Sequence, residues 1–266
     1  MKTIRSLERG LEVLALFDEP RSYGLAEIHQ RTGIAKATLL RILLTLEQKK
    51  LVWRAIADGA YRRTRGVVPR NLTEERCFRT GELAAPFLER LQKKAIWPSD
   101  LLVYRDYKLE LVESSRRRSN LGIQLYRVGY RVDLFLSAPG RAFLAFCSPE
   151  RLTDILDDAS RNPPKNLRAQ SVIRNELDQI LEETRRLGYG GRDSLFGGSD
   201  LDIRDYDDLL DAIAVPVIGK QGLIGCMNMV WPRKYRLRAK IVREFLPEMQ
   251  QTAADIANEA DLRLNA

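Results

Sequence analysis

The sequence predicts an α+β protein with two parts: a small helical part that ends in a β-hairpin, and a larger part that mixes helices with strands. The first observation is a helix, tight turn, helix pattern followed at once by a short hairpin. The second is a mixture of strand and helix patterns beyond residue 100. The third is charge, because residues 1–80 hold 16 Lys and Arg against 9 Asp and Glu, or +7 of the net +8.

The N-terminal part is organised around LAEIHQRTGIAKATLLRILLTLEQ, residues 25–48. Gly33 allows a sharp turn between the two helices. In the second helix Leu39, Leu43 and Leu46 recur at helical spacing and should face a core. The opposite face is small, polar and cationic, which suits a helix in a DNA major groove, although any solvated helical hairpin would share this pattern. That face consists of Ala37, Arg41, Thr45 and Gln48.

A β-hairpin is predicted directly after these helices. Residues 51–54 alternate apolar and polar, Asp58-Gly59 is a strong turn signal, and residues 60–62 return. A helix-turn-helix with such a hairpin is a winged helix-turn-helix domain. The hairpin is rich in arginine, which suits contacts to DNA phosphates. These arginines are Arg54, Arg62, Arg63 and Arg65.

Individual DNA contacts are predicted along the second helix. Lys36 and Thr38, near its N-terminus, can bond phosphates together with the free backbone N–H groups there. Arg41 is the candidate for a base-edge contact, because its guanidinium can bond both acceptors of guanine. Leu40 and Leu44 lie towards the same side; they either touch thymine methyl groups or pack against the hairpin, and packing is the preferred interpretation.

The stretches RSLERGLEVL, GLAEIHQRTGIAKATLLRILLTLEQKKLV and GAYRRT resemble the N-terminal domain of IclR-type transcriptional regulators. Residues 5–17 form the first predicted helix, with Leu7, Leu11, Leu14 and Phe17 on one face. The resemblance implies that an arginine at this helix start touches the DNA backbone; Arg5 and Arg9 are the candidates, and a charged face in water is the alternative. It also implies a linker helix over residues 72–81, followed by a helix over 83–94, with the domain boundary near residue 80.

Residues 81–266 are predicted to form a mixed α/β domain. The expected strands are 101–104, 109–112, 121–128, 212–217 and 223–229, the first two joined by a turn at Asp106-Tyr107. The expected helices are 141–147, 173–187 with Gly188 as its cap, and a terminal helix with Ile241, Phe245, Met249, Ala253 and Ile256 in register.

In this order, SAPGRAFLAF, RRLGYG, AIAVPV and LIGCMNM resemble the GAF-like effector-binding domain of the same family, so the resemblance covers nearly the whole chain. WPSD, GRAFLAFC, GYG and IGCMNMV are similar to the branch containing the regulator of hydroxyphenylpropionate catabolism. The resemblance implies a dimer or tetramer on a roughly palindromic double-stranded DNA operator, and a small organic acid, here an aromatic one, as effector. A short oxoacid such as glyoxylate or pyruvate is the alternative effector.

The implied effector pocket lies at the turn into the helix at 141–147 and on the last two strands. Helix N-termini suit carboxylates, although an ordinary helix start has the same sequence. Asn228 is polar in an apolar strand and needs a partner, either a ligand or a backbone group. Candidate aromatic walls are Tyr104, Tyr126, Phe135 and Trp231. The effector-binding candidates are Ser137, Ala138, Gly140, Arg141, Ala212, Ala214, Cys226 and Asn228.

An enzyme is not expected. The only histidine, His29, lies in the DNA-binding part, and the chain has neither a G-x-S-x-G elbow nor a P-loop. A histidine-independent hydrolase is the remote alternative. Cys77, Cys147 and Cys226 are widely spaced, which predicts reduced thiols and a cytoplasmic protein. We expect neither a metal site nor a cofactor, because the chain has no histidine and cysteine cluster, although a site made of carboxylates alone stays open. No apolar run reaches the roughly 20 residues of a membrane span.

Overall fold

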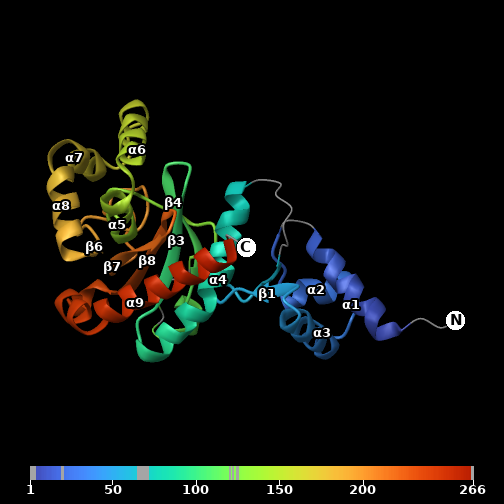
Figure 1. Ribbon diagram of the computed structural model, residues 1–266. Helices are drawn as coiled ribbons and strands as arrows, with labels where there is room; N and C mark the ends of the chain where they lie inside the picture. Colours follow the sequence, from blue (N-terminus) through green and yellow to red (C-terminus); the bar gives the residue numbers. More distant parts are fainter. Residues whose placement is uncertain are drawn as a thin grey trace.

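The computed structural model describes residues 4–18, 21–64, 72–119, 121, 123 and 126–264. The chain forms two lobes, a small N-terminal one and a larger C-terminal one (Figure 1). The elements of the small lobe are α1 (Arg5–Ala15), η1 (Leu16–Asp18), α2 (Leu25–Thr32), α3 (Lys36–Gln48), β1 (Val52–Arg54) and β2 (Tyr61–Arg63).

The small lobe is a winged helix-turn-helix, as predicted. α2 ends at Gly33, whose φ of +66° lies in the left-handed region that favours glycine. His29 supports the turn, with its Nδ1 2.8 Å from the carbonyl oxygen of Ile34. Leu39 and Leu43 are fully buried in the core of this lobe, which confirms the predicted inner face of α3.

The apolar face predicted for the first helix is divided in the structure. Phe17 is buried against Tyr23, with ring centroids 5.5 Å apart and nearly perpendicular ring planes. Leu7 and Leu11, one and two turns into α1, are exposed instead. The core therefore contacts only the C-terminal end of this helix and its 3₁₀ extension.

The large lobe is built on one six-stranded antiparallel sheet with the order β5-β4-β3-β8-β7-β6. Its strands are β3 (Ser99–Arg105), β4 (Lys108–Ser114), β5 (Arg131–Val132), β6 (Gly190–Gly191), β7 (Leu210–Gly219) and β8 (Gly222–Pro232). Its helices are α4 (Leu72–Lys94), α5 (Ala138–Phe146), α6 (Pro149–Arg161), α7 (Leu167–Asn175), α8 (Leu177–Leu187) and α9 (Arg238–Leu264), with 3₁₀ turns η2 (Arg116–Arg118) and η3 (Arg233–Tyr235).

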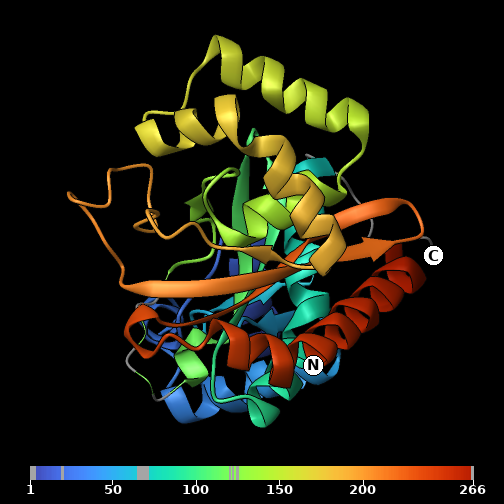
Figure 2. The same ribbon diagram turned by 90° about the vertical axis from the view of Figure 1, so that its left-hand side faces the viewer.

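Helices cover both faces of this sheet. α5 to α8 lie on one face, and α4 and α9 lie on the other (Figure 2). Alternation along β7 divides its side chains accordingly, so that Ala212 and Ala214 face α5 while Ile213 and Val215 face α9. Alanines on the α5 side let that helix approach the sheet closely.

Four predicted elements differ from the structure. The helices expected over 72–81 and 83–94 are one helix, α4, because Gly81 does not end it; Gly81 packs against β4, where a Cβ would lie 2.7 Å from the carbonyl oxygen of Val112. The described residues between 121 and 128 form no strand, and the short β5 pairs with β4 instead. The helix expected over 173–187 is interrupted at Glu176, whose φ of −131° is not helical.

The remaining predicted strands are confirmed. Asp106 and Tyr107 form a two-residue turn between β3 and β4 with φ values of +46° and +57°, the conformation of type I′ hairpin turns. β7 and β8 pair along their whole length around residues 219–222. Gly188 ends α8 at a φ of +73°, as predicted for a helix cap.

Candidate functional site

The outer face of α3 is a free surface. The side chains opposite its buried leucines are exposed, except Thr38, which is half-buried. The hydroxyl of Thr45 donates to the carbonyl oxygen of Arg41 at 2.9 Å, while the Arg41 guanidinium binds no group in the described part of the chain. This face carries the predicted DNA contacts Lys36, Ala37, Thr38, Arg41 and Thr45.

Two leucines interrupt this polar face. Leu40 is 46% exposed and Leu44 is 55% exposed, so neither packs against the hairpin as we expected. About half of each leucine side chain is therefore open to solvent. On a DNA-reading helix, such side chains are suited to contacts with thymine methyl groups.

Most of the described hairpin arginines bind groups within the small lobe. Arg62, expected to be a free surface cation, is 5% exposed, and its guanidinium binds the two carboxylate oxygens of Asp58 at 2.6 and 3.0 Å. Arg63 binds Asp18 and the carbonyl oxygen of Leu14. A phosphate contact from Arg62 is therefore incompatible with its burial in this structure.

The other predicted phosphate contacts remain accessible. Arg54 is exposed; its Nε donates to the carbonyl oxygen of Gly59 at 3.0 Å, and its guanidinium lies over the Tyr61 ring. Arg5 is exposed and Arg9 is half-buried on α1. Arg65 lies outside the described residues.

The N-terminus of α5 is satisfied within the chain. The Ser137 hydroxyl accepts from the N–H of Gly140 at 3.0 Å and donates to the carbonyl oxygen of Asp133 at 2.5 Å. A Cβ on Gly140 would lie 2.3 Å from the carbonyl oxygen of Leu134, so this glycine serves packing. Arg141 binds the Asp193 carboxylate at 2.7 Å. Gly140 and Arg141 are therefore both engaged by neighbouring groups of the chain at this helix start.

A small cavity of about 30 Å³ lies between this helix start and the sheet. Ser137, Ala138, Ala212 and Asn228, four of the predicted effector-binding residues, line it. Ala214 and Cys226 share the sheet face with them but lie beneath α5, away from the cavity. The side-chain oxygen of Asn228 accepts from the N–H of Asp100 at 2.8 Å, so a backbone partner explains it.

The sequence-based interpretation missed the charged residues that line this cavity. Arg116 and Asp100 form a buried ion pair of 2.6 Å, and the Ser114 hydroxyl donates to the same carboxylate. Arg192 and Asp208 form a second pair of 2.6 Å. The available signals were the Arg-Arg-Arg run at 116–118 directly after a strand and the aspartate of WPSD.

Two stacked tyrosines connect these ion pairs. The Arg116 guanidinium lies 4.6 Å from the centroid of the Tyr126 ring. The Tyr126 hydroxyl donates to Asp208 at 2.9 Å, and its ring stacks on Tyr130 with centroids 4.1 Å apart. Burial and the Asp208 carboxylate raise the pKa of Tyr126, so it is a hydrogen-bond donor at neutral pH. Among the candidate aromatic walls, only Tyr126 borders this cavity.

The thiols show no sign of catalysis or cross-linking. Cys147 and Cys226 are free, and burial raises the pKa of both. A thiol with a raised pKa is a poor nucleophile at neutral pH. The side chain of Cys77 lies outside the described part of the chain. Within that part there is no cluster of three or more His, Cys, Asp or Glu side chains that could bind a metal ion, and no helix there could span a membrane.

Comparison with known proteins gives the family. The IclR helix-turn-helix domain matches residues 6–54, and the bacterial transcriptional regulator IclR C-terminal domain matches residues 80–258. The DNA-binding transcriptional repressor YiaJ of Escherichia coli is 24% identical, over 96% of this chain and 87% of that protein.

Solved structures agree on the fold. An IclR family transcriptional regulator from Brucella abortus has a TM-score of 0.54 at 23% identity, covering 97% of this chain and 92% of that one. An IclR homolog from Microbacterium hydrocarbonoxydans, complexed with 4-hydroxybenzoate, has a TM-score of 0.50 at 20% identity, covering 96% and 98%.

A winged helix with an exposed outer face on α3, joined to an α/β domain with a small cavity, defines a ligand-responsive DNA-binding regulator. The chain belongs to the IclR family of transcriptional regulators. Members of this family regulate transcription and are not enzymes.

Proposed function

We propose that this protein controls an aromatic-acid catabolic operon, and that a small aromatic acid bound in the C-terminal cavity modulates operator binding or activation. The observation that carries the proposal is the pair of buried arginines, Arg116 and Arg192, that line the cavity together with Tyr126 and Tyr130. A guanidinium offers the planar donors that a carboxylate needs, and tyrosine rings offer a surface for an aromatic group.

The acid would bind by replacing an aspartate as the partner of a buried arginine. Its carboxylate would replace Asp100 on Arg116 or Asp208 on Arg192, since each guanidinium already binds a carboxylate. The free volume of about 30 Å³ has room for a water molecule but not for a benzoate ring. Binding therefore requires Tyr126 and Tyr130 to move, which would couple occupancy to conformation.

The bound acid reported for the Microbacterium hydrocarbonoxydans homolog supports an aromatic ligand, although that identity of 20% establishes only the fold here. The small free volume supports testing the short oxoacids as well, because glyoxylate and pyruvate need less rearrangement.

Isothermal titration calorimetry on the intact protein tests this proposal. The series compares 4-hydroxybenzoate, hydroxyphenylpropionates, benzoate and protocatechuate with glyoxylate and pyruvate. We expect an aromatic acid to bind, and Arg116→Lys to weaken it about tenfold or more through loss of the planar fork. Arg118→Lys, two residues on and exposed, is the matched control and should bind normally. Binding of short oxoacids alone would contradict the aromatic assignment, and no binding by any acid would contradict the cavity.

We propose that α3 lies in the major groove of the operator. Two copies of the chain, as a dimer or within a tetramer, would place two such helices on half-sites about one helical turn, or a multiple of it, apart. The domain boundary that we propose, near residue 80, then falls within α4. The proposed DNA contacts are Arg5, Arg9, Lys36, Ala37, Thr38, Arg41, Thr45, Arg54 and Arg63.

Selection from a random duplex library by the intact protein tests the DNA proposal. Enriched sequences should contain an inverted repeat with such a spacing, because the two-fold axis of a dimer relates the half-sites. Enrichment of a single unrepeated site by a monomer would contradict it.

A further inference from the structure

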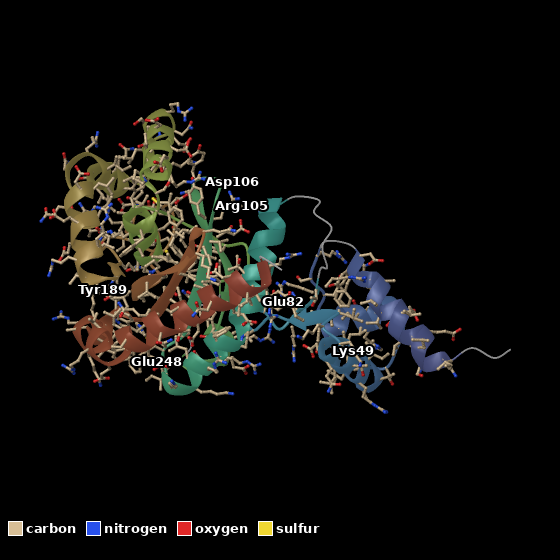
Figure 3. All side chains as sticks on the ribbon, viewed as in Figure 1. Lys49, Glu82, Arg105, Asp106, Tyr189 and Glu248 are labelled. Carbon is tan, nitrogen blue, oxygen red and sulfur yellow. The ribbon has the colours of Figure 1, made fainter. Side chains whose placement is uncertain are left out.

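The tip of the hairpin, residues 55–60, contacts the large lobe instead of projecting into solvent. Ala55, Ile56 and Ala57 are all buried, and Ile56 belongs to the same apolar cluster as Ala84 and Leu88 of α4. In Figure 1 the hairpin meets α4 where the two lobes join. Figure 3 places Glu82, also on α4, at this junction, where it accepts from the Thr64 hydroxyl at 3.3 Å.

A single carboxylate accepts hydrogen bonds from the main chain of the tip. Glu113, on β4, is fully buried, and its two oxygens accept from the N–H of Ala57 at 2.8 Å and of Ile56 at 3.2 Å. Nearby, the Arg117 guanidinium donates to the carbonyl oxygen of Asp58. The tip is therefore held through its main chain at three successive residues.

The chemistry of the tip suits a protein partner better than DNA. The tip sequence, AIADGA, has three alanines, an isoleucine and no cation. Its one charged side chain, Asp58, would be repelled by phosphates and is neutralised by Arg62. The buried Arg62–Asp58 pair thus shapes a loop whose apolar residues enter the large lobe.

The segment that holds the tip also borders the cavity. Glu113 and Arg117 contact the tip, whereas Ser114 and Arg116 bind Asp100 at the cavity wall. Ser114 follows Glu113 directly, and its N–H donates to that carboxylate at 2.8 Å. A rearrangement around Asp100 must therefore move groups that lie one residue from the tip contact.

We propose that the contact of residues 55–60 with Glu113 and Arg117, here called the tip contact, fixes the winged helix on the effector domain, and that residues 113–117 couple this contact to the cavity. The coupling half rests on the proposed effector function of the cavity. An acid that takes Arg116 from Asp100 displaces residues 113–117, loosens the tip contact and frees α3 to change its orientation.

Amide hydrogen exchange of the intact, ligand-free protein tests the tip contact. Glu113→Gln removes one acceptor, because the amide nitrogen cannot accept from an N–H. We expect exchange in peptides covering residues 55–61 to rise about tenfold or more, the effect of losing one charge-assisted hydrogen bond. Glu110→Gln on the same strand, where the carboxylate faces Arg105 and Arg131, is the matched control and should leave these peptides unchanged.

Arg117→Ala provides a second variant that cannot unfold the core, since Arg117 is exposed. It should also raise exchange over residues 55–61, by a smaller factor than Glu113→Gln. In every variant, exchange in β7 and β8 should stay as in the wild type, which would show that the large lobe remains folded. Unchanged protection of residues 55–61 in both Glu113→Gln and Arg117→Ala would overturn the tip contact.

Arg116→Lys tests the coupling without any ligand. It disturbs the ion pair with Asp100 at the cavity and leaves Glu113 and Arg117, which bind the tip, unchanged, so faster exchange over residues 55–61 supports the coupling. If exchange over residues 55–61 rises in Glu113→Gln but stays unchanged in Arg116→Lys, the coupling is overturned and the tip contact stands. Because no acid is added, a failure of the proposed effector function appears separately, as absence of binding in calorimetry.

Discussion

At the scale of single residues, the arginines of the small lobe divide into two groups. Arg41 projects from α3 without a partner in the described part of the chain, while Arg62 and Arg63 bind aspartates of their own lobe. A guanidinium free of internal partners can exchange water for a base edge at little cost. A guanidinium that is paired and buried, as that of Arg62 is, must first lose its carboxylate partner.

Arg41→Ala should therefore reduce operator affinity by about 1–3 kcal/mol and relax specificity at one base pair. Fluorescence anisotropy with a selected operator and its single-base variants measures both effects. Gln48→Ala, at the far end of the same exposed face, is the control. If the ranking of the sequences is the same for Arg41→Ala and the wild type, Arg41 does not contact a base.

Arg62→Ala should act on stability. Removing the guanidinium leaves the half-buried Asp58 carboxylate without its main partner and costs about 1–3 kcal/mol of unfolding free energy. Thermal unfolding followed by circular dichroism measures this loss, with Arg54→Ala, an exposed neighbour, as the control. An unaltered melting temperature, with reduced affinity for every DNA sequence, would restore Arg62 to the phosphate contacts.

Glu113 should make stability depend on pH. Burial raises the pKa of this carboxyl from 4.5 to about 7, although three backbone N–H groups and the Arg62 charge lower it. The folded state then binds this proton more tightly than the unfolded state, so the contribution of Glu113 to stability is greatest below pH 4.5 and is lost as the pH rises through about 7. The shift corresponds to a change of the order of 3 kcal/mol.

Denaturant unfolding on both sides of this pH window, for the wild type and Glu113→Gln, isolates the effect. As the pH rises, the wild type should lose stability relative to Glu113→Gln, whose amide does not titrate. A difference that is constant with pH would show that Glu113 has an ordinary pKa.

At the scale of helices and strands, sequence patterns correctly predicted the elements that depend on residues close together in the chain. The inner leucines of α3, the Asp106-Tyr107 turn and the β7–β8 hairpin depend on neighbours in sequence, and all are as predicted. β5 has two residues and exists through its pairing with β4, which no periodicity reveals. The unbroken α4 depends on the packing of Gly81 against β4, a tertiary contact.

The site was predictable only in part for the same reason. Ser137, Ala138, Ala212 and Asn228 could be found from strand and helix patterns, and they line the cavity. The ion pairs at the cavity join residues distant in sequence, Asp100 with Arg116 and Arg192 with Asp208, from different segments of the large lobe. Spacing along the chain cannot show that these groups meet.

Glycines within helices have opposite predicted effects in α5 and α1. Gly140→Ala should lower stability by about 1–3 kcal/mol, because its Cβ would lie 2.3 Å from the carbonyl oxygen of Leu134. Gly10→Ala, where a Cβ meets no atom within 4 Å, should raise stability by about 0.5–1 kcal/mol. Thermal unfolding of both variants measures this contrast. Equal effects would mean that the close packing at the start of α5 is not a constraint.

At the scale of the whole molecule, the described contacts between the lobes include the tip contact on β4, the packing of Ile56 against α4 and the hydrogen bond from Thr64 to Glu82. The positive charge is concentrated in the DNA-binding part, with +7 of the net +8 in residues 1–80. The cavity lies in the other lobe, on a strand that ends at the tip contact. The positively charged part and the cavity thus lie in different lobes.

We propose that an acid in the C-terminal cavity alters DNA binding. The most direct measurement is the affinity of the intact protein for a selected operator, with and without the acid that binds in calorimetry, in the wild type and in Arg116→Lys. We predict a change in operator affinity of about fivefold or more for the wild type, within the usual range of allosteric coupling, and a smaller one for Arg116→Lys at the same acid concentration. Equal operator affinity with and without saturating acid would contradict the claim.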